Sequence, residues 1–419
     1  MKTTTKIKSQ LKPFCQAVIA ALSVLSATSA HSLIISEDFT GATTNHEWYM
    51  PQPGNGVTID PINRPAQNTA CLTAGTGTAL PTATQAGSPP RCTSPATADT
   101  MGNGAMRLTP ATIYRAGGIV SKFDFPTNDG VEITFTTYTW GGNGADGMTF
   151  FLADADRPPT LGATGGSLGY PCSNGNPIYS GVDGGYFGIG MDEYGNYVNQ
   201  ADNTNSGVGF NKNTIAIRGA GSINIGYLGN ADHFLQDVYT SQGWGTVPAH
   251  IKTAWNQKWA DNPLQLRDVC SSGRLNLSDT ETGGRGLLNL SEQATDPKLK
   301  LYNYKLLDRV TFTGANSSLY SNVTTRAAAT PILYRIKITP DGKASVWYSR
   351  NGGTYAPVML DRDIVSTNGP LPRAFRFGFT GATGGSHNNH EVTCFKAAPA
   401  IESQGSASVS LPNAQAIAD

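Results

Sequence analysis

The chain has 419 residues, including 48 glycines and 25 prolines, which together make up about 17% of it against an average of about 12%. Glycine costs a helix about 1 kcal/mol relative to alanine and proline about 3 kcal/mol, so this composition excludes a long helical bundle or coiled coil. A hydrophobic fraction of 39%, with 30 basic and 30 acidic residues, excludes wholesale disorder and binding that depends on a high net charge. We therefore expect a loop-rich β protein.

The first thirty residues predict a secretory signal peptide. Residues 1–12 hold four lysines, residues 14–25 are mostly apolar, and residues 27–30 are small. The apolar run is shorter than the roughly 20 residues of a membrane span, and no later segment qualifies as one. The alternative is an N-terminal helix packed on the domain. The preferred interpretation places the protein outside a bacterial cell or on its surface.

Removal of residues 1–30 leaves 26 basic and 30 acidic residues, with no cluster of lysine or arginine. A mildly acidic chain of this kind is not expected to bind nucleic acid or anionic lipid. Export permits disulfides, and Cys71 with Cys92 is the most local pair. Cys172 with Cys270 is the next candidate, which would leave Cys394 over.

Short strands dominate the chain up to the middle. A strand is expected within residues 33–39, followed by a long Pro/Thr/Gly-rich loop at 40–105 that the disulfide would clip. Further strands are predicted from β-branched and aromatic residues with period two. They cover residues 131–138, 148–152, 186–191 and 214–218.

The second half opens with a helical insertion at about 230–300, where apolar residues recur at helical spacing in residues 247–259. A hairpin follows at 332–348 and a last strand at 375–379. The pattern predicts an all-β, two-sheet antiparallel sandwich over residues 31–399 with a small helical insertion. Residues 400–419 are expected to be a flexible tail or linker, with a further C-terminal domain or surface assembly as a possible partner.

Four motifs carry the chemistry, and the first two are glycine-rich loops beside apolar strands. Asp146 stands between glycines at the mouth of a strand, where it could accept hydrogen bonds from vicinal hydroxyls of a neutral ligand. The alternative is a turn aspartate that caps its own backbone. Gly165 and Gly166 could let backbone N–H groups approach a ligand, although this pair is weak by itself.

The third motif is a loop of oxygen donors. The Asp192 carboxylate, the Tyr194 carbonyl and the Asn196 amide supply the hard ligands that Ca²⁺ needs, and Asp202 could add a second carboxylate. The alternative is a solvated acidic loop. The spacing is not that of an EF-hand, because the closing glutamate is absent. Other candidates for the second carboxylate or amide position are Asn199, Asn203, Asn205 and Asp183.

The fourth motif is a strand at 378–382 that ends in a small-residue loop. In this order, residues 145–152, 165–169, 192–196 and 378–385 resemble the L-type (legume-lectin-like) family, in its bacterial secreted or surface branch. The chain also resembles the lectin-like N-terminal module of a pilus-tip-type adhesin. The resemblance covers roughly residues 33–398 and implies a concanavalin A-like jelly roll that binds carbohydrate with calcium and is not an enzyme.

The resemblance also implies roles for single residues. The sugar would be bound by Asp146, Gly166, Tyr194, Asn196, Gly384, Gly385 and Ser386. Calcium would be bound by Asp192, Tyr194, Asn196 and Asp202. Legume members carry a glutamate where this chain has Gly190, so the resemblance implies calcium without manganese. It further implies a cis peptide bond between Ala145 and Asp146.

Two other functions remain open. A glycan-cleaving hydrolase of the same fold would need a close carboxylate pair. Asp154 and Asp156 alternate, but the prolines that follow them at 158 and 159 suggest a loop. A structural or adhesive surface module without an active sugar site is the second alternative. His387 and His390 could bind metal, but they are expected to be loop and edge residues.

Overall fold

The computed structural model describes residues 33–53, 67–93, 99–171, 181–197, 209–219, 221, 228–261, 275–290, 306–313 and 318–401. Several expectations fall outside these ranges. They are the signal peptide, nearly all of the tail, the Cys172–Cys270 pair and the four loop residues Asn199, Asp202, Asn203 and Asn205.

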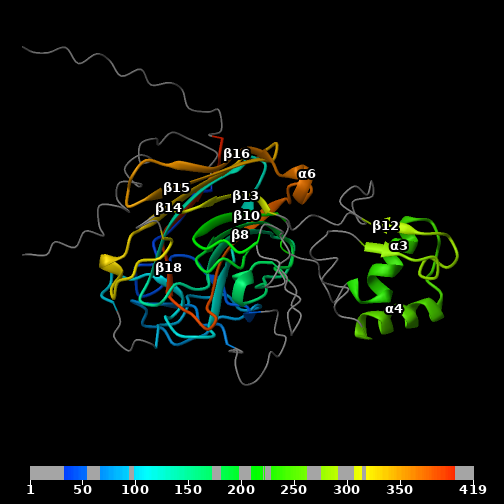
Figure 1. Ribbon diagram of the computed structural model, residues 1–419, viewed down its shortest axis with the longest axis horizontal. Helices are drawn as coiled ribbons and strands as arrows, with labels where there is room; N and C mark the ends of the chain where they lie inside the picture. The colour runs from blue at the N-terminus through cyan, green and yellow to red at the C-terminus, as the bar shows by residue number, and fades with distance from the viewer. Residues whose placement is uncertain are drawn as a thin grey trace, which may run out of the picture.

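Two eight-stranded antiparallel sheets make up the main body (Figure 1). The first sheet has the order β16 (Ala356–Asp363), β15 (Lys343–Arg350), β14 (Ile332–Ile338), β7 (Val131–Trp140), β18 (Asn389–Ala398), β4 (Met106–Thr109) and β3 (Cys71–Leu72), with β1 (Ile35–Glu37) paired to β18. The second sheet has the order β13 (Leu306–Thr311), β10 (Thr214–Arg218), β9 (Gly185–Asp192), β8 (Gly147–Asp154), β17 (Ala374–Ala382), β5 (Ala116–Ser121) and β2 (Trp48–Tyr49), with β6 (Phe125–Pro126) paired to β17. The predicted two-sheet antiparallel sandwich is confirmed.

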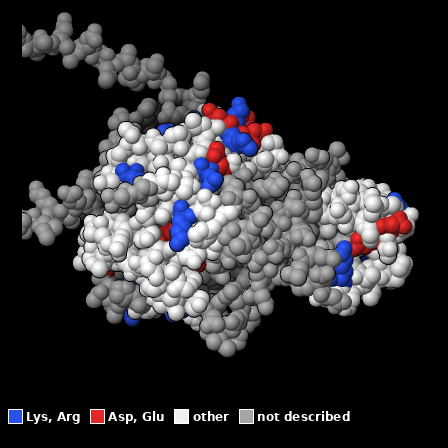
Figure 2. Space-filling view, in the orientation of Figure 1, with Lys and Arg blue, Asp and Glu red and all other residues white. Residues whose placement is uncertain are grey.

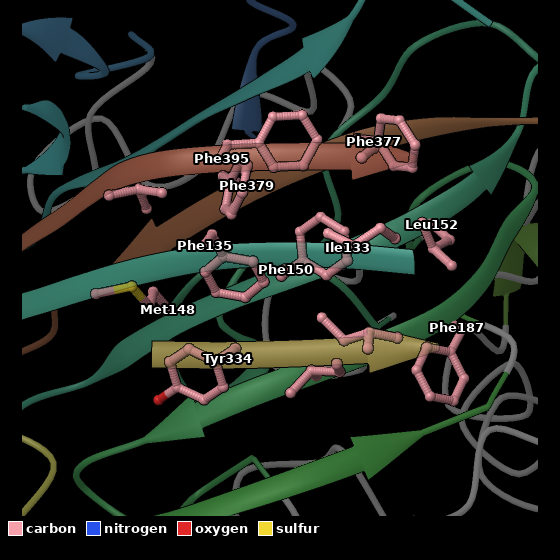
Figure 3. Packing of buried hydrophobic residues seen from close by; sticks show 14 of the residues in the cluster. Ile133, Phe135, Met148, Phe150, Leu152, Phe187, Tyr334, Phe377, Phe379 and Phe395 are labelled. Atoms are coloured by element: carbon pink, nitrogen blue, oxygen red, sulfur yellow. The ribbon is translucent and has the colours of Figure 1, made fainter. Parts of the chain in front are cut away.

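Aromatic side chains from both sheets fill the space between them (Figure 3). The ring of Phe135 on β7 lies 4.9 Å from that of Phe150 on β8 and 5.1 Å from that of Phe379 on β17, measured between centroids. In β14 every second residue is buried, as the alternation of Ile332, Tyr334, Ile336 and Ile338 predicts. In β14 the period-two pattern therefore decides which face of the strand enters the core.

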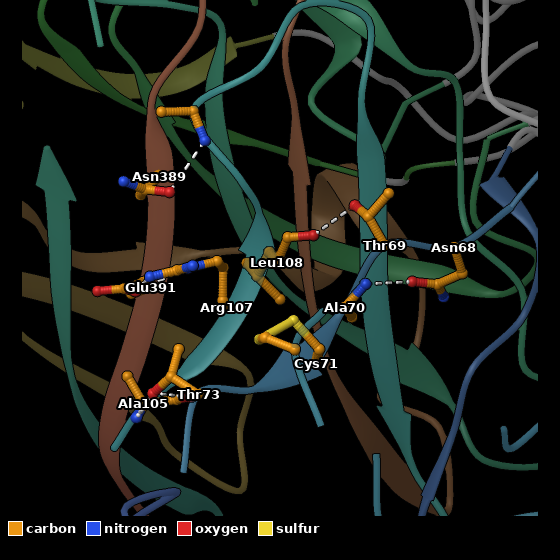
Figure 4. The surroundings of a disulfide bond; sticks show 12 residues. Asn68, Thr69, Ala70, Cys71, Thr73, Ala105, Arg107, Leu108, Asn389 and Glu391 are labelled. Atoms are coloured by element: carbon orange, nitrogen blue, oxygen red, sulfur yellow. Dashed lines mark hydrogen bonds and ion pairs between the residues drawn. A yellow bond between two sulfur atoms is a disulfide. The ribbon is translucent and has the colours of Figure 1, made fainter. Parts of the chain in front are cut away.

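The described part of the long loop at 40–105 contributes edge strands β2 and β3 to the two sheets. The predicted disulfide between Cys71 and Cys92 is present (Figure 4). The prediction that Cys394 is left over is wrong. This cysteine is disulfide-bonded, and its partner lies outside the described residues.

The inserted segment has a core of its own. It contains η4 (Ala231–Leu235), α3 (Gln236–Ser241), α4 (Ala249–Asp261), and the hairpin of β11 (Leu275–Leu277) and β12 (Leu288–Leu290). Val247, Ile251, Trp255 and Trp259 are buried in it, whereas Ala254 is exposed. Among the described residues, no helix has the length and hydropathy of a membrane span.

Candidate functional site

Strand register brings three predicted loops to one end of the second sheet. Ala382 of β17 pairs with Gly147 of β8, which pairs with Asp192 of β9. Asp146 stands directly before this row, and the loop at 383–386 starts directly after it. Residues that are far apart in the sequence therefore meet because their strands begin or end at the same level.

The peptide bond between Ala145 and Asp146 is cis, as the resemblance implies. The Asp146 amide donates to the carbonyl of Ala382 at 3.1 Å. Its carbonyl accepts from the amides of Glu193 at 3.0 Å and Tyr194 at 3.2 Å. The loop that carries Asp146 is thus tied both to β17 and to the loop after β9.

Gly384 lies against the carboxylate of Asp146. A Cβ atom added at Gly384 would stand 3.2 and 3.3 Å from the two Asp146 oxygens, whereas one added at Gly385 would meet nothing within 4 Å. The loop is held in place because the Gly384 carbonyl accepts from Tyr114 at 3.0 Å and its amide donates to Ser386 at 3.1 Å. The structure therefore joins Asp146 and the loop at 383–386 in one site.

This geometry predicts an effect of one methyl group. If the site binds the carbohydrate expected from the sequence, Gly384→Ala should weaken that binding by about tenfold, because the methyl crowds the Asp146 carboxylate and displaces a ligand hydroxyl hydrogen-bonded to it, a loss of roughly one net hydrogen bond. Titration calorimetry with a bound glycan measures the change. Gly385→Ala is the matched control, since its Cβ meets no protein atom. Equal losses in the two variants would show that the loop backbone, and not the contact with Asp146, is responsible.

Asp192 is a fully buried carboxylate at the end of β9. Its Oδ1 accepts from the Gly195 amide at 2.7 Å and its Oδ2 from the Tyr197 amide at 2.8 Å. Burial raises the pKa of Asp192 well above its usual value, the two amide hydrogen bonds lower it, and the nearby charges of Asp146 and Glu193 raise it further. No basic side chain in the described part of the chain forms an ion pair with Asp192.

The oxygen atoms of the loop that carries Asp192 fit a hard divalent cation as ligands. Asp146, Asp192 and Glu193 are all buried, and the charges of the other two act on Asp192, so a cation beside Asp192 would offset this repulsion. The Asn196 amide and the Tyr194 carbonyl lie in the same loop as Asp192 and offer only oxygen ligands. Among the described residues no group of three or more His, Cys, Asp or Glu side chains could hold a metal. A calcium ion at this loop would therefore depend on amide and carbonyl oxygens as well as on the Asp192 carboxylate.

The ring of Tyr194 is half-buried beside other side chains. Phe210 meets it edge-on, with 5.5 Å between ring centroids, and the Lys212 Nζ stands 5.0 Å over one face. A ligand could stack only on the remaining face.

The space beside Gly190 is filled by the ring of Tyr197. A Cβ atom at Gly190 would lie 2.5 Å from Cε1 of that ring, so a glutamate side chain has no room there. The carbonyl of Tyr197 accepts from Nη1 of buried Arg218 at 2.7 Å. Tyr197, with Arg218 packed over its ring, thus fills the space that a glutamate side chain at position 190 would need.

Gly166 is buried in η2 (Gly165–Ser167). This turn is fixed to the second sheet, because the hydroxyl of Thr380 on β17 donates to the carbonyl of Leu168 at 2.6 Å. Thr380 lies two residues before Ala382, so the turn packs close to the row that positions Asp146.

Three acidic candidates lie elsewhere. Asp183 precedes β9 at the end opposite Asp192 and pairs with Arg157 at 2.8 Å, so it is not part of the site. Asp154 ends β8 at the side opposite Asp146, and exposed Asp156 pairs with Arg373 at 2.7 Å. The carboxylate pair that a hydrolase would use therefore does not face the glycine loops.

His390 was expected to be a loop or edge residue, and this expectation is wrong. It is fully buried in β18, because this central strand is covered on both faces. Its Nε2 lies 3.0 Å from Oε1 of Glu193, which is 1% exposed. Sequence patterns missed Glu193 and Asn388 as members of this site, since a buried polar pair between two sheets leaves no periodic signal.

No family model matches the chain, and no curated protein matches it. Similar solved structures include a VIP36 exoplasmic/lumenal domain in a Ca²⁺/Man3GlcNAc-bound form, with 14% identity over 72% of this chain and 83% of that one and a TM-score of 0.35. Peanut lectin with a 9mer peptide has 12% identity over 87% and 98% of the chains and a TM-score of 0.38. Winged bean acidic lectin complexed with methyl-α-D-galactose has 13% identity over 71% and 86% and a TM-score of 0.36. At such identities and scores these likenesses carry no argument about function.

Proposed function

We propose that this protein binds carbohydrate with calcium and does not catalyse a reaction. The observation that carries the proposal is the meeting of buried Asp146 with Gly384 on one side and the Asp192 loop on the other. A glycine beside a carboxylate leaves room for a ligand to reach the acceptor oxygens. Vicinal sugar hydroxyls are ligands of the right chemistry, because each donates a hydrogen bond to an anionic acceptor.

Each residue has a defined task in this proposal. Asp146 accepts hydrogen bonds from two hydroxyls, and the backbone of Gly384, Gly385 and Ser386 lines the ligand beside it. Asp192, the Tyr194 carbonyl, Asn196 and Asp202 would hold calcium. The bound ion would neutralise the buried carboxylates and fix the side chain of Asn196 toward the sugar.

We further propose that the protein is exported and acts at a bacterial surface, as the lectin-like part of an adhesin. The signal-like residues 1–30 support export. On the face drawn in Figure 2, basic and acidic side chains lie beside one another and do not gather by sign, which suits a neutral glycan. A single site of this kind binds weakly, so adhesion would depend on several copies.

A glycan array of the full chain tests this function. With Ca²⁺ present we expect binding to a defined set of glycans, and with a chelator we expect the signal to fall to background. Calcium titration by calorimetry gives the metal stoichiometry separately. Binding that the chelator leaves unchanged would contradict the calcium site. Calcium binding with no glycan bound would instead favour a structural surface module.

A further inference from the structure

The side chain of Glu193 crosses from the second sheet to the first. Its Oε1 lies 3.0 Å from Nε2 of His390 on β18, and its Oε2 accepts from Nδ2 of Asn388 at 2.5 Å. Nδ1 of His390 in turn lies 2.6 Å from the hydroxyl of Thr109 on β4. All four side chains are buried, so this polar bridge is shielded from water.

The backbone of the same residue holds the Asp146 loop. The Glu193 amide donates to the Asp146 carbonyl at 3.0 Å, and the Glu193 carbonyl accepts from the Asn213 amide at 3.2 Å. Glu193 therefore contacts the Asp146 loop through its main chain and the end of the 383–388 loop through its side chain.

A second link joins the same two loops. The Asn143 amide donates to the His387 carbonyl at 2.8 Å, and the His387 amide donates to Oδ1 of Asn143 at 2.7 Å. His387 precedes Asn388, so the base of the 383–388 loop is fixed at two adjacent residues. These hydrogen bonds anchor the C-terminal end of the loop that carries Gly384.

We propose that Glu193 is a positioning and specificity-determining residue, which sets the distance between Asp146 and the loop at 383–386 and so decides which sugars fit. The proposal rests on the carbohydrate-binding function proposed above. Glu193 acts through other residues, because both its carboxylate oxygens are engaged by His390 and Asn388. Removal of the outer-shell partners that orient metal ligands typically costs 10–100-fold in metal affinity or activity, and we expect an effect of similar size on the sugar here.

The structure also predicts which substitution is tolerated. Oδ1 of Asn388 is buried and has no hydrogen-bond partner within the described residues. If the Asn388 amide turns over, this oxygen can accept from the amide that Glu193→Gln introduces. Glu193→Gln should therefore keep hydrogen bonds to both His390 and Asn388. Glu193→Ala removes both, and it leaves these two polar side chains buried without that partner.

The test compares the full-length wild-type protein with Glu193→Ala, Glu193→Gln and Glu47→Ala. Glu47 is the control, because its carboxylate is 55% exposed and pairs only with exposed Lys122 in the described structure. Hydrogen exchange is measured on the 383–388 segment. Glycan affinity is measured with Ca²⁺ on a panel of mannose-, galactose-, glucose- and N-acetylglucosamine-terminated glycans.

For Glu193→Ala we expect at least tenfold faster exchange in the segment, a 10–100-fold loss of glycan affinity and a changed ranking of sugars. Glu193→Gln and Glu47→Ala should match wild type. A folded Glu193→Ala protein with wild-type exchange and an unchanged ranking overturns the proposal. If Glu193→Ala does not fold, Asn388→Ala takes its place. This substitution removes one of the two hydrogen-bond partners of the Glu193 carboxylate, and the same outcomes support or overturn the proposal.

The two hypotheses fail in different ways. Wild-type protein that binds none of the glycans overturns the proposed function, and the exchange rates then decide by themselves whether Glu193 positions the loop. Wild-type protein that binds, together with variants that leave both readouts unchanged, overturns only the role of Glu193.

Discussion

Asp146→Ala should abolish glycan binding, with a loss of about 100-fold or more. Each hydrogen bond to a charged acceptor contributes about 1.5–3 kcal/mol, and the substitution removes two at once. The Asp146 carboxylate also lies against Gly384, so the substitution removes the acceptor oxygens beside this loop. Calorimetry or a glycan array with Ca²⁺ measures the loss.

Asp156→Ala is the matched control for this substitution. Asp156 follows β8 at its other end and pairs with exposed Arg373, so its removal should leave binding unchanged. If Asp146→Ala retained the affinity of the wild type, the proposed sugar site would be in the wrong place.

Glu391→Ala should have the largest effect on stability, a loss of about 3–5 kcal/mol in the free energy of unfolding. Glu391 is fully buried and accepts from Arg107 at 2.8 Å, from Arg326 at 2.6 Å and from the Trp140 indole at 2.8 Å. Arg107 and Arg326 are also buried, so the substitution leaves two guanidinium groups short of their acceptor (Figure 4 shows Arg107 beside Glu391). Urea denaturation at pH 7 measures the loss.

Glu132→Ala is the control for this cluster. Its ion pair with Arg335 is partly exposed, so we expect a change below about 1 kcal/mol. A Glu391→Ala protein as stable as Glu132→Ala would show that the buried cluster contributes little to folding.

The same carboxylate predicts a pH dependence. Burial opposes ionisation of Glu391, but the charges and hydrogen bonds of Arg326 and Arg107 outweigh it and lower the pKa to about 2. The stabilisation is therefore complete above the ordinary pKa of 4.5 and is lost as pH falls from 4.5 toward 2, by ~3 kcal/mol in all. Glu391→Gln should remove this part of the acid limb. Denaturation curves of both proteins between pH 2 and about 7 provide the comparison, and parallel curves would contradict the assignment.

The sequence predicted the strands well where one face is buried. In β14 the alternation of isoleucine and polar residues matches the burial pattern residue by residue, because the period of a strand is two. The sequence pattern was a poorer guide to burial in β18, where His390 and Glu391 are both fully buried. A central strand covered on both faces shows no alternation, so His390 was expected to be a loop or edge residue.

The candidate site residues also divide into those that the structure brings together and those that it does not. Asp146, Gly384 and the Asp192 loop were proposed from motifs in the sequence, and the strand register brings them together. The Asp202 ligand lies outside the described residues and stays a prediction. Asp183 precedes β9 at the end opposite Asp192, and Asp154 ends β8 at the side opposite Asp146. The length of each strand therefore keeps these two carboxylates away from the site.

By itself the sequence determined a glycine-rich, all-β sandwich with an inserted helical segment, and it predicted the residue types of the proposed carboxylate and calcium site. These follow from local chemistry: backbone propensity, period and donor type. Only the tertiary structure decided that Tyr197 fills the space at Gly190, that Cys394 is disulfide-bonded, and that Glu193 joins the loops through His390 and Asn388. These contacts join residues up to 197 positions apart, and they depend on how two sheets stack and in which register, which no local pattern encodes.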